Sequence, residues 1–168
     1  LFIHQGQICM AGSRVIVEEP VYEKFLELFV AKVKTLKVGD PHDHHTVIGP
    51  LIKTSQCPFI ATRIESSKAQ GARVLCGGAI PNGPGAFYPP TVLTNLKPGM
   101  PAYDDELFGP VASVIVARDT DDAIRIANDS PFGLGGGVFT PDLALGEKIA
   151  VEDIEAGLGF VNGAVADR

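Results

Sequence analysis

The sequence lacks several features that define particular classes of protein. It has 14 basic against 20 acidic residues and a formal net charge of −6, so it offers no excess of positive charge for nucleic-acid phosphates. No apolar run approaches the roughly 20 residues that a membrane-spanning helix requires. The first residues have neither the basic start nor the long apolar stretch of a signal peptide. We therefore expect neither a nucleic-acid nor a membrane partner.

Cysteine is scarce and shows no paired spacing. The three cysteines are Cys9, Cys57 and Cys76. An odd number without a Cys-x-x-Cys motif argues against a disulfide framework and a structural zinc site, and it favours a reducing compartment, the cytoplasm. Three histidines cluster between residues 42 and 45, but turn residues surround them and no further ligand stands at a suitable helical offset. We expect an exposed loop there and predict no metal site.

At 168 residues, the chain is long enough for one hydrophobic core and a single domain. Short apolar, β-branched runs predict strands at residues 14–17, 74–75, 111–117, 137–139 and 158–161. Helical spacing and capping residues predict helices at 20–36 and 58–70, a helix capped by Thr120, and a helix from Thr140 to about Gly157. This alternation indicates an α/β fold with a layered, largely parallel sheet flanked by helices.

The segment GQICMAGSR at residues 6–14 carries the most chemical information. A cysteine between glycine-containing turns, directly before a strand, can be held on a loop that a substrate reaches. The thiolate is the nucleophilic form, and Arg14 is a candidate for favouring it, although its side chain can equally point away. From spacing alone, a lone cysteine is more often a small buried hydrophobe, so both interpretations of Cys9 stay open at this point.

Four segments together resemble the aldehyde dehydrogenase superfamily, in that family's order and over nearly the whole chain. The first is the Cys9 segment at residues 6–14, and the second, DDELFGPV at residues 104–111, is similar to the family's Glu-x-Phe-Gly-Pro segment. The third runs from residue 127 to residue 140, and the fourth is the strand at residues 157–162. The resemblance implies an NAD(P)-dependent aldehyde dehydrogenase and the fold of its catalytic domain.

The resemblance also implies a role for each site residue. Cys9 attacks the aldehyde carbonyl to give a thiohemiacetal, hydride passes to the nicotinamide of NAD or NADP, and the resulting thioester is hydrolysed to the carboxylic acid. The backbone N–H of Cys9 contributes to the oxyanion hole. Glu106 hydrogen-bonds the hydroxyls of the nicotinamide ribose, and Phe108 packs near that end of the cofactor. Without this context, Glu106 is simply a solvated acid in an acidic loop.

Several parts of the family pattern do not occur in these residues. They are the Rossmann-like cofactor domain, the Glu-Leu-Gly-Gly general base, the asparagine of the oxyanion hole, the Pro-Phe-Gly-Gly segment and the oligomerisation tail. We therefore expect residues 1–168 to be the cysteine-bearing catalytic portion of a longer protein, weak or inactive by itself. The resemblance implies that the parent protein is a homo-oligomer and binds its cofactor mainly through the missing domain.

The substrate is less well specified. The segment HQGQICM at residues 4–10 is similar to that of benzaldehyde, vanillin and salicylaldehyde dehydrogenases, which favours an aromatic aldehyde. Residues 160–163 resemble both that group and succinate-semialdehyde dehydrogenases. We interpret Asn162 in this stretch as mainly structural, since Asn-Gly makes a good turn. The glycines at 133–137 precede a strand rather than opening a helix, so we expect packing or a turn there and no phosphate site.

Two other functions remain alternatives. The chain could be a non-catalytic structural or interaction protein on the same scaffold, but the joint presence of Cys9, Glu106 and Phe108 favours an enzyme. It could also be a cysteine thioester hydrolase or acyltransferase. That chemistry needs a histidine partner, and the four histidines form no recognisable dyad with Cys9.

Overall fold

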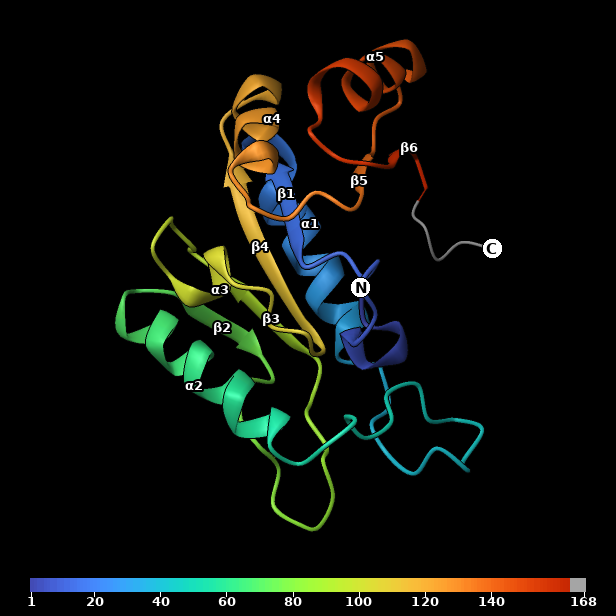
Figure 1. The fold of residues 1–168 in the computed structure, drawn as a ribbon, viewed down its shortest axis with the longest axis vertical. Coiled ribbons are helices and arrows are strands. Elements are labelled where there is room, and N and C mark those ends of the chain that lie inside the picture. The colour runs from blue at the N-terminus through green and yellow to red at the C-terminus, as the bar shows by residue number, and fades with distance from the viewer. Residues whose placement is uncertain (164–168) are drawn as a thin grey trace.

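The computed structural model describes residues 1–163, and its main sheet has four strands (Figure 1). They are β1 (Arg14–Glu18), β2 (Arg73–Cys76), β3 (Thr91–Thr94) and β4 (Val111–Ala117), in the spatial order β1-β4-β3-β2. β1 and β3 run parallel to β4, and β2 pairs antiparallel with β3 at one edge. The sheet is therefore largely parallel, as predicted.

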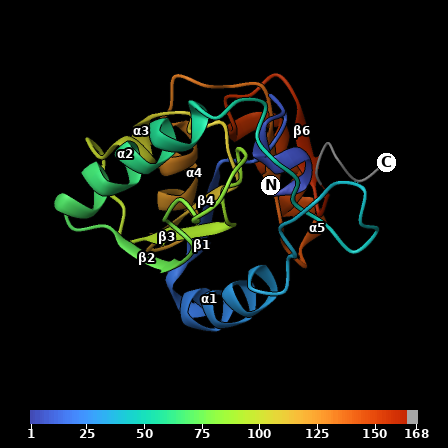
Figure 2. The same cartoon turned by 90° about the horizontal axis from the view of Figure 1, so that it is seen from below.

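Helices cover both faces of this sheet (Figure 2). α1 (Glu19–Val33) lies on one face, and α2 (Gln56–Ala69), α3 (Pro101–Asp104) and α4 (Thr120–Asn128) lie on the other. Within β4, Ala112 and Val114 belong to the core under α1, whereas Val111 and Ile115 belong to the core under α2. Because both faces are buried, β4 is almost continuously apolar instead of alternating with polar residues.

A smaller unit follows α4 at the C-terminal side (Figure 1). β5 (Gly136–Val138) and β6 (Gly159–Val161) form a two-stranded parallel sheet, joined through α5 (Leu143–Lys148) and a π-helical turn, η2 (Ile149–Asp153). The side chain of Asn128 connects α4 to this unit: Nδ2 donates to the carbonyl of Asp153 at 2.8 Å and Oδ1 accepts from the amide of Glu155 at 3.0 Å. The half-buried Asn128 side chain thus links the end of α4 to the C-terminal unit.

The structure adds two elements and corrects two sequence predictions. The sequence predicts no element at β3 or α3: Pro89 and Pro90 precede β3, Pro101 is the first residue of α3, and proline normally indicates loops. Asp119 caps α4 through a 2.8 Å bond to the amide of Asp122, so Thr120 is the first helical residue and not the cap. The helix expected at residues 140–157 is too long, since Asp142 caps α5 and η2 ends at Asp153. In both helices an aspartate carboxylate satisfies the first amides in place of a threonine.

The three clustered histidines lie at the surface. His42, His44 and His45 are exposed, and the His42 ring lies 2.9 Å from the carboxylate of Asp40. Among the helices within residues 1–163, none combines the length and the apolar composition needed to cross a bilayer.

Candidate active site

Two loops that are far apart in the sequence meet at the candidate site. We name them the Cys9 loop (residues 3–13) and the Glu106 loop (residues 105–110). Gly6 packs directly on the backbone of Gly109: a Cβ at Gly6 would overlap that residue's carbonyl oxygen and lie 2.6 Å from its carbonyl carbon. Gly6 also has a φ of +66°. Only glycine satisfies both conditions without strain, so the contact between the loops depends on this residue.

Cys9 lies on an exposed turn of its loop and its thiol is free. The turn is closed by a 2.9 Å bond from the amide of Ala11 to the carbonyl of Ile8. The other two cysteines differ. Cys57 is buried and Cys76 is half-buried, and burial raises the pKa of both thiols. Because reactivity requires access and the thiolate form, Cys9 is the thiol best placed to act as a nucleophile.

The two loops line a common hollow. Gly6 and Ile8 on one side and Glu106 and Phe108 on the other border a cavity of about 20 Å³, which is room for roughly one water molecule. A wider open groove of about 350 Å³ adjoins it, lined in part by His4, Gln7 and Phe108. Phe108 borders both spaces. The neighbours of Cys9 in its segment and both predicted cofactor residues therefore lie around one region of the molecule, whereas Cys9 itself is not among the residues that line either space.

Backbone strain is concentrated in the same two loops. His4, Gln5 and Phe108 have φ values of 52°, 59° and 48°, and the first two lie in a 3₁₀ turn, η1 (Ile3–Gly6). Left-handed backbone is unfavourable for residues other than glycine, and it persists where the surrounding structure enforces it, commonly at functional sites. The strain therefore supports the assignment of the two loops as a site.

Helix α2 holds the Glu106 loop in place through two side chains. Gln56 Nε2 donates to the carbonyls of Leu107 and Phe108, both at 3.2 Å. Arg63 Nε forms an ion pair with Asp105 at 3.1 Å. Sequence reasoning missed Gln56 and Arg63, and no local signal marks them, because their partners lie far along the chain. Glu106 itself stays exposed between these attachments, and the Phe108 side chain is 37% exposed.

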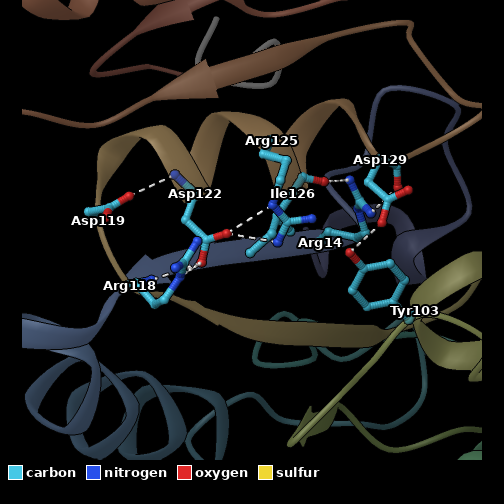
Figure 3. Close-up of polar contacts among 8 residues, drawn as sticks. All are labelled: Arg14, Tyr103, Arg118, Asp119, Asp122, Arg125, Ile126 and Asp129. Carbon is cyan, nitrogen blue, oxygen red and sulfur yellow. Dashed lines mark hydrogen bonds and ion pairs between the residues drawn. The ribbon is translucent and has the colours of Figure 1, made fainter.

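The structure decides the open question about Arg14. Its guanidinium donates to the backbone carbonyls of Ile126 and Asp129 (Figure 3) and to that of Ala127, all at the end of α4. All three distances lie between 2.6 and 2.9 Å. Its donors are engaged there, and within residues 1–163 no hydrogen bond joins Arg14 to the Cys9 thiol.

Asn162 and the glycine-rich segment have structural contacts, in agreement with the sequence interpretation. Asn162 accepts from the amide of Thr140 and donates to its carbonyl, both at 2.8 Å. A Cβ at Gly136 would lie 2.8 Å from the side chain of Ile154, so this strand of the small sheet packs closely on its neighbour. These residues bind the C-terminal unit together.

Comparisons with known proteins agree with this geometry. The model of the aldehyde dehydrogenase family matches residues 1–168. A succinate-semialdehyde dehydrogenase (NADP(+)) of Mycobacterium avium (strain 104) is 46% identical over 160 residues, covering 95% of this chain and 34% of the relative. The succinate semialdehyde dehydrogenase Sad (NAD(P)+) of Escherichia coli (strain K12) is 42% identical over 161 residues, covering 96% of this chain and 35% of the relative.

Solved structures give the same result at the level of the fold. Betaine aldehyde dehydrogenase from Staphylococcus aureus in complex with NAD+ matches with a TM-score of 0.91 and 35% identity, over 96% of this chain and 33% of that chain. An aldehyde dehydrogenase from Physcomitrella patens in complex with the reaction product succinate matches with a TM-score of 0.91 and 35% identity, over 99% of this chain and 34% of that chain. The chain spans about a third of the length of the curated relatives it matches.

Proposed function

Because this chain belongs to the aldehyde dehydrogenase family, we propose that residues 1–168 are the cysteine-bearing catalytic domain of an NAD(P)-dependent enzyme that oxidises an aldehyde to a carboxylic acid. One observation carries the proposal: the exposed Cys9 lies on a loop that packs directly against the loop bearing Glu106 and Phe108. In the proposed enzyme, the nucleophile and the cofactor contacts therefore belong to one rigid arrangement.

Cys9 is the proposed nucleophile. Its thiolate forms an Sγ–C bond to the aldehyde carbonyl, and the carbonyl oxygen takes the electron pair to give a thiohemiacetal. Loss of hydride from that carbon leaves a thioester on Cys9, and attack by water releases the carboxylic acid and restores the thiol. The backbone N–H of Cys9 is proposed to stabilise the developing oxyanion, and removing one such donor typically costs about 3 kcal/mol in the barrier.

Glu106 and Phe108 are the proposed cofactor contacts, and the exposure of both side chains supports this proposal. The exposed Glu106 carboxylate can accept hydrogen bonds from two ribose hydroxyls, and the partly exposed Phe108 ring offers an apolar face for packing. When bound, NAD or NADP supplies the acceptor for the hydride. The protein's own task here is to keep the loop fixed, which the two bonds from Gln56 accomplish.

For the substrate, we propose a small aldehyde and keep two candidates. The Cys9 segment favours an aromatic aldehyde, whereas succinate semialdehyde is named for several relatives of this chain. The ratio of kcat/KM for benzaldehyde and succinate semialdehyde in the full-length enzyme distinguishes them. We further propose that the parent protein is a cytoplasmic homo-oligomer.

The decisive test compares Cys9→Ala with Cys76→Ala in the full-length enzyme. Loss of the nucleophile should lower turnover at least about 10³-fold, while Cys76→Ala, in β2, should retain nearly full activity. Wild-type enzyme should require NAD or NADP and should carry an acyl group on Cys9 that is visible by peptide mass spectrometry. Normal turnover of Cys9→Ala would exclude the mechanism. Thioester cleavage without cofactor as the sole activity would favour the hydrolase alternative, and a complete lack of activity would favour a structural role.

A further inference from the structure

Arg14 makes an unusual set of contacts for a residue beside a proposed nucleophile. It is the first residue of β1, directly after the Cys9 loop. Its guanidinium donates to the carbonyls of Ile126 at 2.6 Å, Ala127 at 2.9 Å and Asp129 at 2.8 Å. These carbonyls lie at the C-terminal end of α4, where the helix dipole favours a cation. Arg14 therefore ties the end of the Cys9 loop to α4.

The same cluster reaches the Glu106 loop through Tyr103 (Figure 3). The Arg14 guanidinium carbon lies 5.3 Å from the centroid of the Tyr103 ring, within the range of a cation–π interaction. The Tyr103 hydroxyl donates to the carboxylate of Asp129 at 2.9 Å. Tyr103 is only 5% exposed and lies in α3, directly before the Glu106 loop. Three elements thus converge: the start of β1, α3 and the end of α4.

The Cys9 loop is consequently restrained at both ends but open in between. Gly6 fixes its first half against Gly109, and Arg14, the residue directly after the loop, anchors its end on α4. Between these two points Cys9 is exposed. This arrangement presents a thiol to solvent without leaving its position free to vary, which is what a preorganised nucleophile needs.

We infer that Arg14, Tyr103 and Asp129 form a positioning cluster that sets the Cys9 loop relative to the Glu106 loop. The inference rests on the function proposed above. In this inference Arg14 acts on the position of the loop, because its guanidinium N–H groups are engaged by backbone carbonyls of α4. Arginine suits the role because its planar fork directs several N–H groups at fixed angles, whereas lysine keeps the charge but presents a compact ammonium group. The structure therefore predicts that charge alone will not replace Arg14.

The experiment compares Arg14→Met, Arg14→Lys and Tyr103→Phe in the full-length enzyme with Arg118→Met as a matched control. Arg118 contacts Asp122 at the opposite end of α4 and is 77% exposed. For Arg14→Met we expect kcat to fall about 10- to 100-fold, with the KM for NAD or NADP changing less than about twofold, since Glu106 and Phe108 keep their attachments to α2. Arg14→Lys should recover only part of kcat, and Tyr103→Phe should show a smaller loss than Arg14→Met.

Hydrogen exchange supplies the readout that a general loss of stability would not reproduce. In Arg14→Met, amides at residues 7–13 should exchange faster while those of β3 and β4 keep their protection. A kcat equal to that of Arg118→Met would overturn the inference. So would a loss of kcat accompanied by faster exchange throughout β4, because Arg14 would then only stabilise the fold. If Arg14→Met does not fold, Arg14→Lys and Tyr103→Phe provide the same comparison.

The two proposals fail in different ways. Full turnover by Cys9→Ala removes the proposed function and this inference with it. An inactive Cys9→Ala together with an unimpaired Arg14→Met removes only the positioning role.

Discussion

The two loops of the candidate site are held by different means. The first half of the Cys9 loop depends on its backbone, with Gly6 against Gly109 and left-handed residues at His4 and Gln5, and the Arg14 side chain anchors only its end. The Glu106 loop depends on side chains from α2, namely Gln56 and Arg63. Backbone contacts leave no room for even one methyl group, whereas side-chain contacts can be lost one at a time. The nucleophile's position should thus be sensitive to small substitutions, and the cofactor loop should respond gradually.

The largest expected effect is a difference in alkylation rate between the exposed Cys9 and the two more buried cysteines. With iodoacetamide, Cys9 should be alkylated well before Cys57 and Cys76. An opening free energy of only about 3 kcal/mol would slow a buried thiol about 100-fold. Since burial raises the pKa of Cys57 and Cys76, their thiolates form at higher pH, and their labelling should lag further behind that of Cys9 near neutral pH. Peptide mass spectrometry over a pH series measures this, and equal labelling of all three thiols in the folded protein contradicts it.

The next largest effect is a loss of stability when the backbone contact between Gly6 and Gly109 is disturbed. Gly6→Ala introduces a left-handed alanine and a clash with the carbonyl of Gly109, so we expect the free energy of unfolding to fall by about 2–5 kcal/mol. Gly12→Ala in the same loop is the control, because nothing lies within 4 Å of its Cβ position and its φ is not positive; its change should stay within about 1 kcal/mol. Urea unfolding of both variants gives the comparison. Similar values for the two would show that the contact between the loops carries no stability.

A smaller loss of stability is expected when the side-chain support of the Glu106 loop is removed. Gln56→Leu removes both bonds to the carbonyls of Leu107 and Phe108, which should lower the free energy of unfolding by about 1 kcal/mol. In the full-length enzyme it should raise the KM for the cofactor more than it lowers kcat. Gln70→Leu, at the other end of α2, is the control, because the Gln70 side chain donates to the carbonyl of Ser66 in the same helix. An unchanged KM for the cofactor in Gln56→Leu would show that cofactor binding does not depend on the support that Gln56 gives to the Glu106 loop.

The smallest effect is expected for Arg63→Met. The ion pair with Asp105 is partly exposed, with side-chain exposures of 32% and 47%. Such pairs contribute about 0–1 kcal/mol and weaken with salt. Thermal unfolding at low and high ionic strength should show a small difference from wild type that disappears at high salt. A larger, salt-independent loss would mean that the Arg63 side chain stabilises α2 by packing, for instance on Phe59, whose ring it overlies at 3.5 Å.

Much of the fold could be predicted from local patterns. The β-branched run at residues 111–117 and the helical spacing after Pro20 are strong signals, because the pattern of apolar residues within each segment is enough to indicate its secondary structure. β3 could not be predicted, since the segment Thr91–Thr94 is short, follows two prolines and becomes a strand by pairing with β2 and β4. The sequence predicts Thr120 and Thr140 as helix caps, whereas Asp119 and Asp142 cap the two helices, because the choice depends on the local turn geometry.

The sequence by itself determined the alternation of strands and helices, the family to which the chain belongs, and the residue types available for chemistry at Cys9, Glu106 and Phe108. Only the tertiary structure decided that Gly6 rests on Gly109, that Gln56 supports the Glu106 loop, and that Arg14 binds the end of α4. The physical reason is that periodicity and capping are properties of neighbouring residues. The contacts that place a nucleophile join segments whose distance is set only when the sheet and its helices have packed.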